Sequence, residues 1–188
     1  GKTSKGRAIQ NLINIENEDK VKAFLVTQDL KDEDYVNNNY VVMVTKKGQT
    51  KKTSLEQYSR PRTNGINAIT IKDGDELLEA KLTNGESQIM IAAKSGKSIR
   101  FEEGKTRPMG RNASGVRGIR LKDDKDEVIG MVSISDDKSD ILVVSKKGYG
   151  KRSSLEDYRI TKRGGKGVKT INITEKTGEL IAIKNVTD

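Results

Sequence analysis

Short runs of apolar, mostly β-branched residues recur along the chain, and a glycine-containing turn follows each of them. The runs Val41–Val44, Ile89–Ala92 and Ile141–Val144 have the length and composition of buried strands. A KKG or KSG turn follows each run and places a glycine where a tight hairpin needs a positive φ. The more polar segments Gln49–Thr53 and Tyr149–Ser153 come next, and they predict the second strands of hairpins.

Two more strand-like segments follow each hairpin, with an acidic turn between them. The first has alternating apolar positions after a small residue, as in GINAITI (65–71), GVRGIRL (115–121) and GVKTINI (167–173). The second predicts closing strands at Leu77–Leu82, Val128–Ile134 and Leu180–Ile183. The intervening SLEQY and SLEDY segments are too short for a stable helix, and they predict one helical turn in which Leu55 and Tyr58 share a face.

These segments recur with a fixed period. Residues 40–58 align without a gap with residues 140–158, and residues 88–106 repeat the same pattern between them. A weaker copy of the glycine segment, AIQNLINI, occupies residues 8–15. The chain therefore contains three complete units of about 50 residues and one partial unit.

The period predicts the fold and the domain organisation. We divide the chain into a partial unit and three complete ones, unit 1, unit 2 and unit 3, at residues 1–39, 40–87, 88–139 and 140–188. Four strands in about 50 residues form a propeller-like blade. The sequence therefore predicts an all-β protein of tandem four-stranded blades, arranged as an arc rather than a closed ring.

Composition limits the core and points to a polyanionic partner. Only 32% of the residues are hydrophobic, so any core must be thin or divided into small units. Lys and Arg number 36 against 27 Asp and Glu, which gives a net charge of +9 and favours nucleic acid as a partner. The basic excess is concentrated in residues 140–188.

Several classes of protein are excluded or disfavoured. Cysteine and histidine are absent, which excludes disulfides, thiolate metal sites and nucleophile–histidine catalysis. No apolar run approaches the roughly 18 residues of a membrane span, and the chain begins at Gly1 without a signal peptide. The acidic turns lack calcium-loop spacing, and we interpret them as solvated β-turns. We expect a fragment of a larger cytoplasmic protein, with no catalytic residue, metal, cofactor or membrane contact.

A basic loop precedes each glycine segment. The three basic loops are SRPRTNG (59–65), RPMGRNASG (107–115) and TKRGGKGVKT (161–170). One such run is compatible with a solvated surface loop as well as with an anion-binding loop. Repeated on successive blades, however, the loops would place cations along a curved rim, which suits duplex DNA bound through its phosphates.

The candidate DNA-binding residues lie in these loops and in the hairpins. The hairpins supply Lys46, Lys47, Lys51, Lys52, Lys146, Lys147, Lys151 and Arg152. The loops supply Arg60, Arg62, Arg107, Arg111, Lys162, Arg163, Gly164, Gly165, Lys166, Gly167 and Lys169. In the third loop we expect the glycines to let backbone N–H groups approach a phosphate, Arg163 to bind two of its oxygens, and the lysines to act as point charges.

The repeated pattern resembles a known family. The apolar strand, the T/S-K-K-G turn, the S-L-E-x-Y segment and the glycine segment are similar to the blades of the C-terminal domain of DNA gyrase A. The stretch KRGGKG (162–167) resembles the box motif of that family, although Thr161 stands where glutamine is expected and two full units precede it.

The resemblance implies a β-pinwheel that binds double-stranded DNA without sequence preference and wraps it around its rim. It further implies an enzyme, the ATP-dependent type II topoisomerase DNA gyrase, in which this part acts with the remainder of the gyrase A polypeptide and with gyrase B. The catalytic residues would then lie elsewhere. The alternatives are the related domain of topoisomerase IV, which usually lacks the box, and a propeller that serves as a protein-interaction platform.

Overall fold

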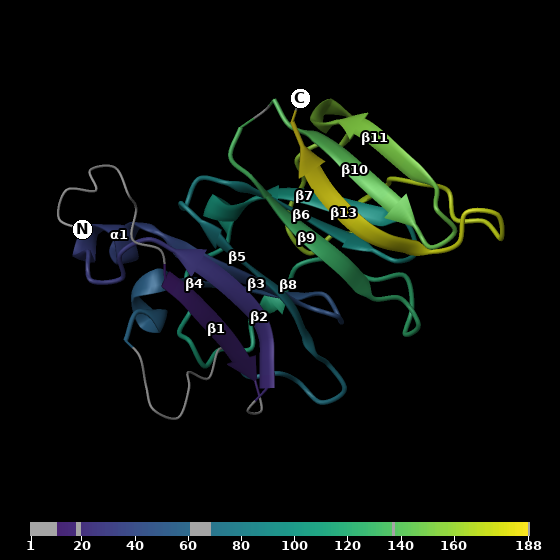
Figure 1. Cartoon of the computed structure of the whole chain (residues 1–188). Helices are drawn as coiled ribbons and strands as arrows, with labels where there is room; N and C mark the ends of the chain where they lie inside the picture. Colours follow the sequence, from purple (N-terminus) through teal and green to yellow (C-terminus); the bar gives the residue numbers. More distant parts are fainter. Residues whose placement is uncertain (1–10, 18–19, 61–68, 137, 188) are drawn as a thin grey trace.

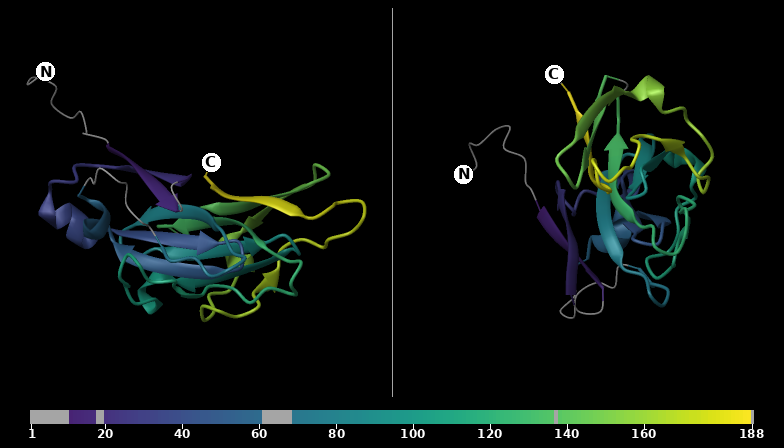
Figure 2. Two further views of the ribbon diagram at one scale, coloured as in Figure 1. Left: turned by 90° about the horizontal axis from the view of Figure 1, so that it is seen from below. Right: turned by 90° about the vertical axis from the view of Figure 1, so that its right-hand side faces the viewer.

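Antiparallel sheets follow one another along the chain in the computed structural model, which describes residues 11–17, 20–60, 69–136 and 138–187. The strands are β1 (Asn11–Asn17), β2 (Lys20–Thr27), β3 (Tyr40–Thr45), β4 (Gln49–Ser54), β5 (Leu77–Thr83), β6 (Gln88–Ala93), β7 (Lys97–Glu102), β8 (Val116–Arg117), β9 (Val128–Ile134), β10 (Asp140–Ser145), β11 (Gly150–Ser154), β12 (Val168–Lys169) and β13 (Leu180–Val186). The β1–β2 hairpin and the sheet of β10, β11 and β13 lie at opposite ends, with the other two sheets between them (Figures 1 and 2). The all-β prediction is confirmed.

The core is divided into three layers between successive sheets. The apolar run of β3 is buried on both faces, because Val41 and Met43 pack into one cluster and Val42 and Val44 into the next. The run of β6 is divided between two clusters in the same way. In β10, by contrast, the burial alternates, because its sheet has a core cluster on one face only. The expectation of a core divided into small units is confirmed.

The fourth strand of a sheet comes from the following unit, which corrects our expectation that each unit supplies its own four strands. The sheet order is β5-β3-β4-β8 in the first case and β9-β6-β7-β12 in the second. β8 belongs to unit 2 but pairs with β4 of unit 1, and β12 of unit 3 pairs with β7 of unit 2. β8 is shorter than the glycine segment that contains it. The N–H groups of Gly118 and Ile119 both donate to the Gly48 carbonyl, and at this point the chain leaves the sheet.

The inner and outer edges of the arrangement differ. The closing strands β2, β5, β9 and β13 contact one another in succession, so they form the inner side. The hairpin strands β4, β7 and β11 lie on the outer side, where β8 and β12 are added. Within the described part of the chain, β11 receives no such strand, and its outer edge is open.

The three hairpin turns lie on one edge of the molecule. Gly48, Gly96 and Gly148 have φ angles of 95°, 94° and 87°, as predicted for these turns. The Lys46 carbonyl accepts a hydrogen bond from the N–H of Val128 (2.8 Å), and the Lys94 carbonyl accepts one from Leu180 (3.0 Å). The first two turns are thus tied to the start of the next unit's closing strand, and the three turns form a row.

The acidic turns are more structured than the solvated turns that we expected. Asp126 is buried, and its carboxylate accepts hydrogen bonds from the N–H groups of Ser95, Lys122 and Glu127 and from the Ser95 hydroxyl (2.7–3.1 Å). Asp75 plays the equivalent part in unit 1, where it accepts from the N–H of Lys47 (2.9 Å). These carboxylates fix the hairpin turns of their own units.

Short helical turns connect the hairpins to the basic loops. They are η1 (Leu55–Tyr58), η2 (Glu103–Lys105) and η3 (Leu155–Asp157), and all three are 3₁₀ turns. Leu55 and Tyr58 are both buried, which confirms the shared face, and burial raises the pKa of Tyr58 to about 12. No sequence pattern had predicted α1 (Glu33–Asn38), which Asp32 caps by accepting from the N–H of Tyr35 (3.2 Å). None of the described helices is long and apolar enough to cross a membrane.

Candidate nucleic-acid interface

The second and third basic loops run along the outer side of the sheets. In unit 3 the Thr161 N–H donates to the Arg100 carbonyl of β7 (2.8 Å), and the Thr170 N–H donates to the Gly96 carbonyl (2.7 Å). In unit 2 the Met109 N–H donates to the equivalent Lys52 carbonyl of β4 (2.7 Å). The second and third loops therefore span the joint between their own unit and the preceding one. The part of the first loop that contains Arg62 lies outside the described residues.

The third basic loop is fixed to the glycine segment of unit 2. The Gly164 N–H donates to the Gly118 carbonyl (2.9 Å), and the Gly165 carbonyl accepts from the Arg120 N–H (2.8 Å). Gly167, at φ 75°, lies against β7, where an added Cβ would be 2.3 Å from the Ser98 carbonyl oxygen. Because the Gly164 N–H is already bonded, we correct the expectation that this glycine offers its N–H to a phosphate. Gly167 is required here for the close packing of the two units.

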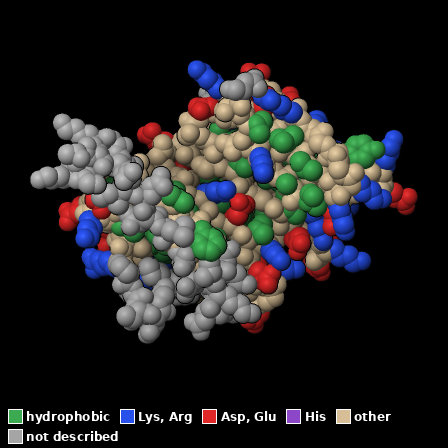
Figure 3. Space-filling view, viewed as in Figure 1, with side chains coloured by type: hydrophobic (Ala, Val, Ile, Leu, Met, Phe, Trp, Pro, Cys, Tyr) green, Lys and Arg blue, Asp and Glu red, His purple; other side chains and the backbone are tan. Residues whose placement is uncertain are grey.

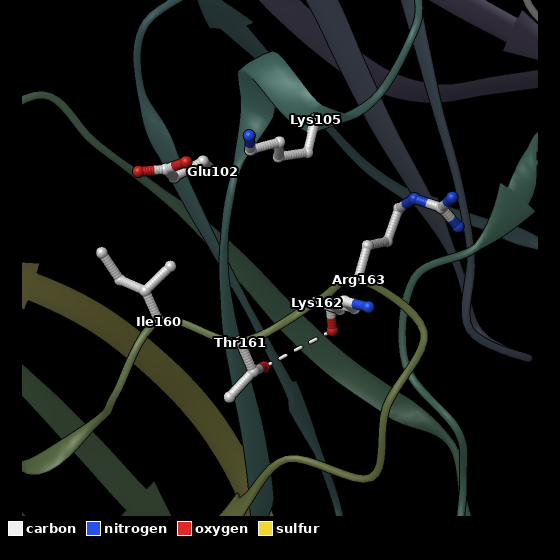
Figure 4. A pocket seen from close by; sticks show the side chains of 6 residues that line it. All are labelled: Glu102, Lys105, Ile160, Thr161, Lys162 and Arg163. Atoms are coloured by element: carbon white, nitrogen blue, oxygen red, sulfur yellow. Dashed lines mark hydrogen bonds between the residues drawn. The ribbon is translucent and has the colours of Figure 1, made fainter.

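Arg163 also bonds within the joint. Its Nη1 donates to the Arg117 carbonyl at 2.6 Å, and its side chain is half-buried. Figure 4 shows the side chain pointing away from Glu102 and Ile160, which lie on the other side of a depression of about 630 Å³. One nitrogen of its guanidinium is therefore used to hold the third loop on unit 2.

The joint between units 2 and 3 gathers exposed cations from both units. Lys162, Lys166 and Lys169 of unit 3 are exposed, as expected. The glycine segment of unit 2 adds Arg117 and Arg120, which are exposed and were not among the predicted residues. Arg117 aligns with the predicted Lys169, so the repeat itself held the signal for it.

Unit 2 carries a less dense set of cations on its own loop. Arg107 is exposed, and Arg111 is half-buried, with its N–H donating to the Gln57 side chain of unit 1 (2.8 Å). Arg60 of unit 1 is 84% exposed and lies 3.5 Å from Glu56. Such an exposed ion pair contributes little to stability and leaves Arg60 accessible.

Two of the predicted DNA-binding lysines are buried, and this is a correction. Lys51 has no exposed surface, and its Nζ donates to the Arg111 carbonyl of unit 2. Lys52 is 4% exposed, and its Nζ lies 3.5 Å from Glu103 and 4.5 Å from the centre of the Tyr40 ring. Both side chains connect unit 1 to unit 2 and are not accessible to DNA.

The equivalent residues of unit 3 are exposed because no further sheet covers them in the described part. Lys151 donates to the Thr170 carbonyl (3.2 Å), and Arg152 pairs with Asp140 (2.8 Å). Arg100, which occupies the same position in unit 2, is buried and donates to the carbonyls of Leu155 and Tyr158 (both 2.9 Å). This position in the second strand thus serves the contact between units.

The hairpin turns present the remaining predicted cations. Lys47, Lys146 and Lys147 are exposed, and the Lys147 Nζ donates to the Glu175 carbonyl. Lys46 is half-buried and pairs with Glu76 at 2.7 Å, which raises its pKa. In Figure 3 the Lys and Arg side chains gather along the right-hand margin, interspersed with acidic ones. Among the described residues, no cluster of acidic side chains could hold a metal ion.

One protein family matches the chain in three successive segments. The family described as "DNA gyrase C-terminal domain, beta-propeller" matches residues 39–84, 87–135 and 139–187. These matches begin and end within a few residues of the unit boundaries derived from the sequence. The family match covers more than half of the chain.

Individual relatives agree with this match. The A subunit of DNA gyrase from two strains of Staphylococcus aureus, NCTC 8325 / PS 47 and COL, is 41% identical over 185 residues. The match covers 98% of this chain and 20% of each relative, so the chain spans about one fifth of the curated proteins that it resembles.

Solved structures share the fold. The C-terminal domain of DNA topoisomerase IV has a TM-score of 0.79 at 24% identity, over 94% of this chain and 53% of that one. The DNA gyrase A C-terminal domain has a TM-score of 0.74 at 20% identity, over 96% of this chain and 67% of that one. At these identities the likeness shows the fold alone. It is the sequence relatives that favour gyrase over topoisomerase IV.

Proposed function

The chain belongs to the family of DNA gyrase C-terminal domains, and on this premise we propose that it binds duplex DNA without sequence preference and bends it around its outer rim. The observation that carries the proposal is the joint between units 2 and 3. Arg117, Arg120, Lys162 and Lys166 are all exposed there, on loops that hydrogen bonds hold together across the two units. Fixed cations on the outer side of the sheets suit the phosphates of bent DNA.

The hairpin turns extend the proposed contact surface. Lys47, Lys146 and Lys147 are exposed on the edge where the three turns form a row. Cations drawn from turns and loops bind phosphates rather than read base edges, so the binding would be indifferent to sequence. The buried Lys51 and Lys52 are left out of this surface.

At the scale of the whole protein, we propose that the chain is the DNA-wrapping part of a gyrase A polypeptide. It would act with the remainder of that polypeptide and with gyrase B in an ATP-dependent type II topoisomerase, where wrapping directs strand passage and negative supercoiling. The relatives named as the A subunit of DNA gyrase support this. The catalytic residues would belong to other parts of the enzyme, and its place of action would be the cytoplasm.

Salt dependence of binding tests the DNA-binding proposal. Affinity for a duplex should fall steeply with salt, with a log–log slope that corresponds to about five or more phosphates. Two duplexes of different sequence should bind alike, and a doubly labelled duplex should show shortened ends when bound. A nearly flat salt dependence would exclude the proposed mode of binding.

A further inference from the structure

A small cavity lies in the joint between units 2 and 3, next to the hairpin turn of unit 2. It measures about 240 Å³, and its lining includes Lys97 of β7, Arg120 and Lys122 of the glycine segment, and Lys166 of the third basic loop. None of the ion pairs found among the described residues involves any of these four. Four like charges around one cavity repel one another, and an anion bound among them would relieve that repulsion.

Asp126 is the one carboxylate in the lining, and its oxygens already accept hydrogen bonds from other groups. Its two oxygens accept hydrogen bonds from Ser95, Lys122 and Glu127, all within its own unit, and the side chain is 4% exposed. Its charge reduces the positive charge of the cavity without cancelling it. The lining therefore keeps an excess of three positive charges (four cations less one carboxylate).

The neighbouring joint shows that the fold does not need these cations. Between units 1 and 2 the Thr70 N–H donates to the Ala113 carbonyl (3.4 Å), as the Arg120 N–H donates to the Gly165 carbonyl in the next joint. The repeat shows which residues hold the equivalent positions there. Gln49 is equivalent to Lys97, Thr70 to Arg120, Lys72 to Lys122 and Ser114 to Lys166. One cation thus stands where the second joint has four, although the backbone is held in the same way.

We propose that this cavity binds a single phosphate group of the DNA backbone and so fixes the position of the duplex on the rim. The proposal rests on the proposed DNA binding and adds to it one discrete, saturable contact. A volume of 240 Å³ is below the roughly 300–1,000 Å³ of pockets for drug-sized ligands, so it suits a phosphate rather than a whole nucleotide. Arg120 can donate two parallel hydrogen bonds to a phosphate, and the lysines add point charges.

The decisive variant replaces three cations of the cavity by the residues found at the equivalent positions of the preceding unit. Lys97→Gln, Arg120→Thr and Lys166→Ser together install the residues of the first joint, which the same backbone already accommodates. The matched control, Lys31→Gln, Lys138→Gln and Lys184→Gln, removes the same charge from exposed positions outside the cavity. Equal unfolding free energies of both variants and the parent chain check that the fold is retained.

The first measurement needs no DNA. Inorganic phosphate is titrated against the chain at constant ionic strength, with the amide resonances of Arg120 and Lys166 as the readout. Saturable shifts are expected in the parent chain and in the control variant, and at least a tenfold weaker response in the cavity variant. Shifts that follow net charge alone, or no shifts at all, would overturn the proposal.

The second measurement links the cavity to the duplex. Because the cations share one phosphate, the cavity variant should lower the salt slope of DNA binding by about one, whereas three separate contacts would lower it by about three. Free phosphate should also weaken DNA binding of the parent chain beyond the effect of chloride at equal ionic strength. A decrease of three in the salt slope would overturn the proposal, because it would mean three separate phosphate contacts. Failure of free phosphate to compete with DNA would also overturn it, because the cavity would then bind a free anion and not the DNA backbone. Absence of any salt-dependent DNA binding would instead refute the proposed function, and the phosphate titration would still report on the cavity.

Discussion

Lys51 couples the stability of the molecule to pH. Burial, with a smaller contribution from the positive charge of Arg111, lowers the pKa of Lys51 from 10.5 to about 7. Between pH 7 and pH 10.5 the unfolded chain therefore binds a proton at this site that the folded chain does not bind. The free energy of unfolding consequently rises with pH across this window, by up to about 1.4 kcal/mol per pH unit from this residue.

Replacement of Lys51 by methionine tests this coupling. The variant keeps an unbranched side chain that is only one atom shorter and loses the ionisable group, so its stability should lack the rise between about pH 7 and pH 10. Urea denaturation at several pH values measures the difference between the two chains, which should shift in favour of the parent as the pH rises. Lys47→Met serves as the exposed control. Parallel stability curves for the parent chain and Lys51→Met would show that Lys51 remains charged in the fold.

Two glycines of the third basic loop should respond differently to alanine. At Gly167 an added Cβ would lie 2.3 Å from a carbonyl oxygen, and the φ of 75° is unfavourable for alanine. At Gly165 the nearest atoms would be 3.7 Å away, an ordinary contact. Gly167→Ala should lower the free energy of unfolding by about 1–3 kcal/mol, and Gly165→Ala should change it by less than about 0.5 kcal/mol. Thermal unfolding distinguishes them, and equal effects would contradict the packing that we describe.

At the scale of elements, the arginines of β7 and β11 occupy equivalent positions with different roles. Arg100 is buried and bonds across to unit 3, whereas Arg152 is exposed and pairs with Asp140. Arg100→Ala should cost about 3 kcal/mol, because it removes bonds to two buried carbonyls, and Arg152→Ala about 0–1 kcal/mol. Chemical denaturation measures both. A larger loss for Arg152→Ala would mean that the strand cations do not act as contacts between units.

The sequence predicted those elements whose partners are close in the chain. The runs of β3, β6 and β10 carry their own signal in apolar, β-branched residues, and the glycine turns fix the hairpins. The pairing of β8 with β4 left no comparable signal, because two residues pair there with a strand more than 60 positions earlier. The alternation of apolar and polar positions in the glycine segments indicated strands, but it could not identify the strands with which they pair.

The same limit applies to the candidate site. The segments KKTS (51–54) and KRSS (151–154) are nearly identical, yet the first two cations are buried in one and exposed in the other. The difference depends on whether another unit packs over the strand, which no local pattern records. The exposed lysines of the third loop could be predicted because their own loop is rich in glycine and charge. The packing role of Gly167 could not be predicted in this way.

At the scale of the whole molecule, the open edge of β11 should promote self-association. Within the described part of the chain this edge has no strand partner, and the exposed Lys151 and Arg152 lie on it. Like charges on an edge oppose pairing with another copy. Salt screens that repulsion, so association should rise with salt while DNA binding falls. Sedimentation velocity at increasing protein concentration in low and high salt measures the effect, and a strict monomer in both would contradict it.

Completion of each sheet by a strand of the following unit has a consequence for synthesis on the ribosome. When β3 and β4 have emerged from the ribosome, more than 60 further residues must be added to the chain before β8, the strand that completes their sheet, emerges. At about 5–20 residues per second, that sheet waits several seconds with an unfilled edge. The sheet of one unit is complete only when the following unit has emerged. During synthesis the last sheet outside the ribosome is therefore always incomplete. A stop codon after any unit would leave that vacancy in the released protein.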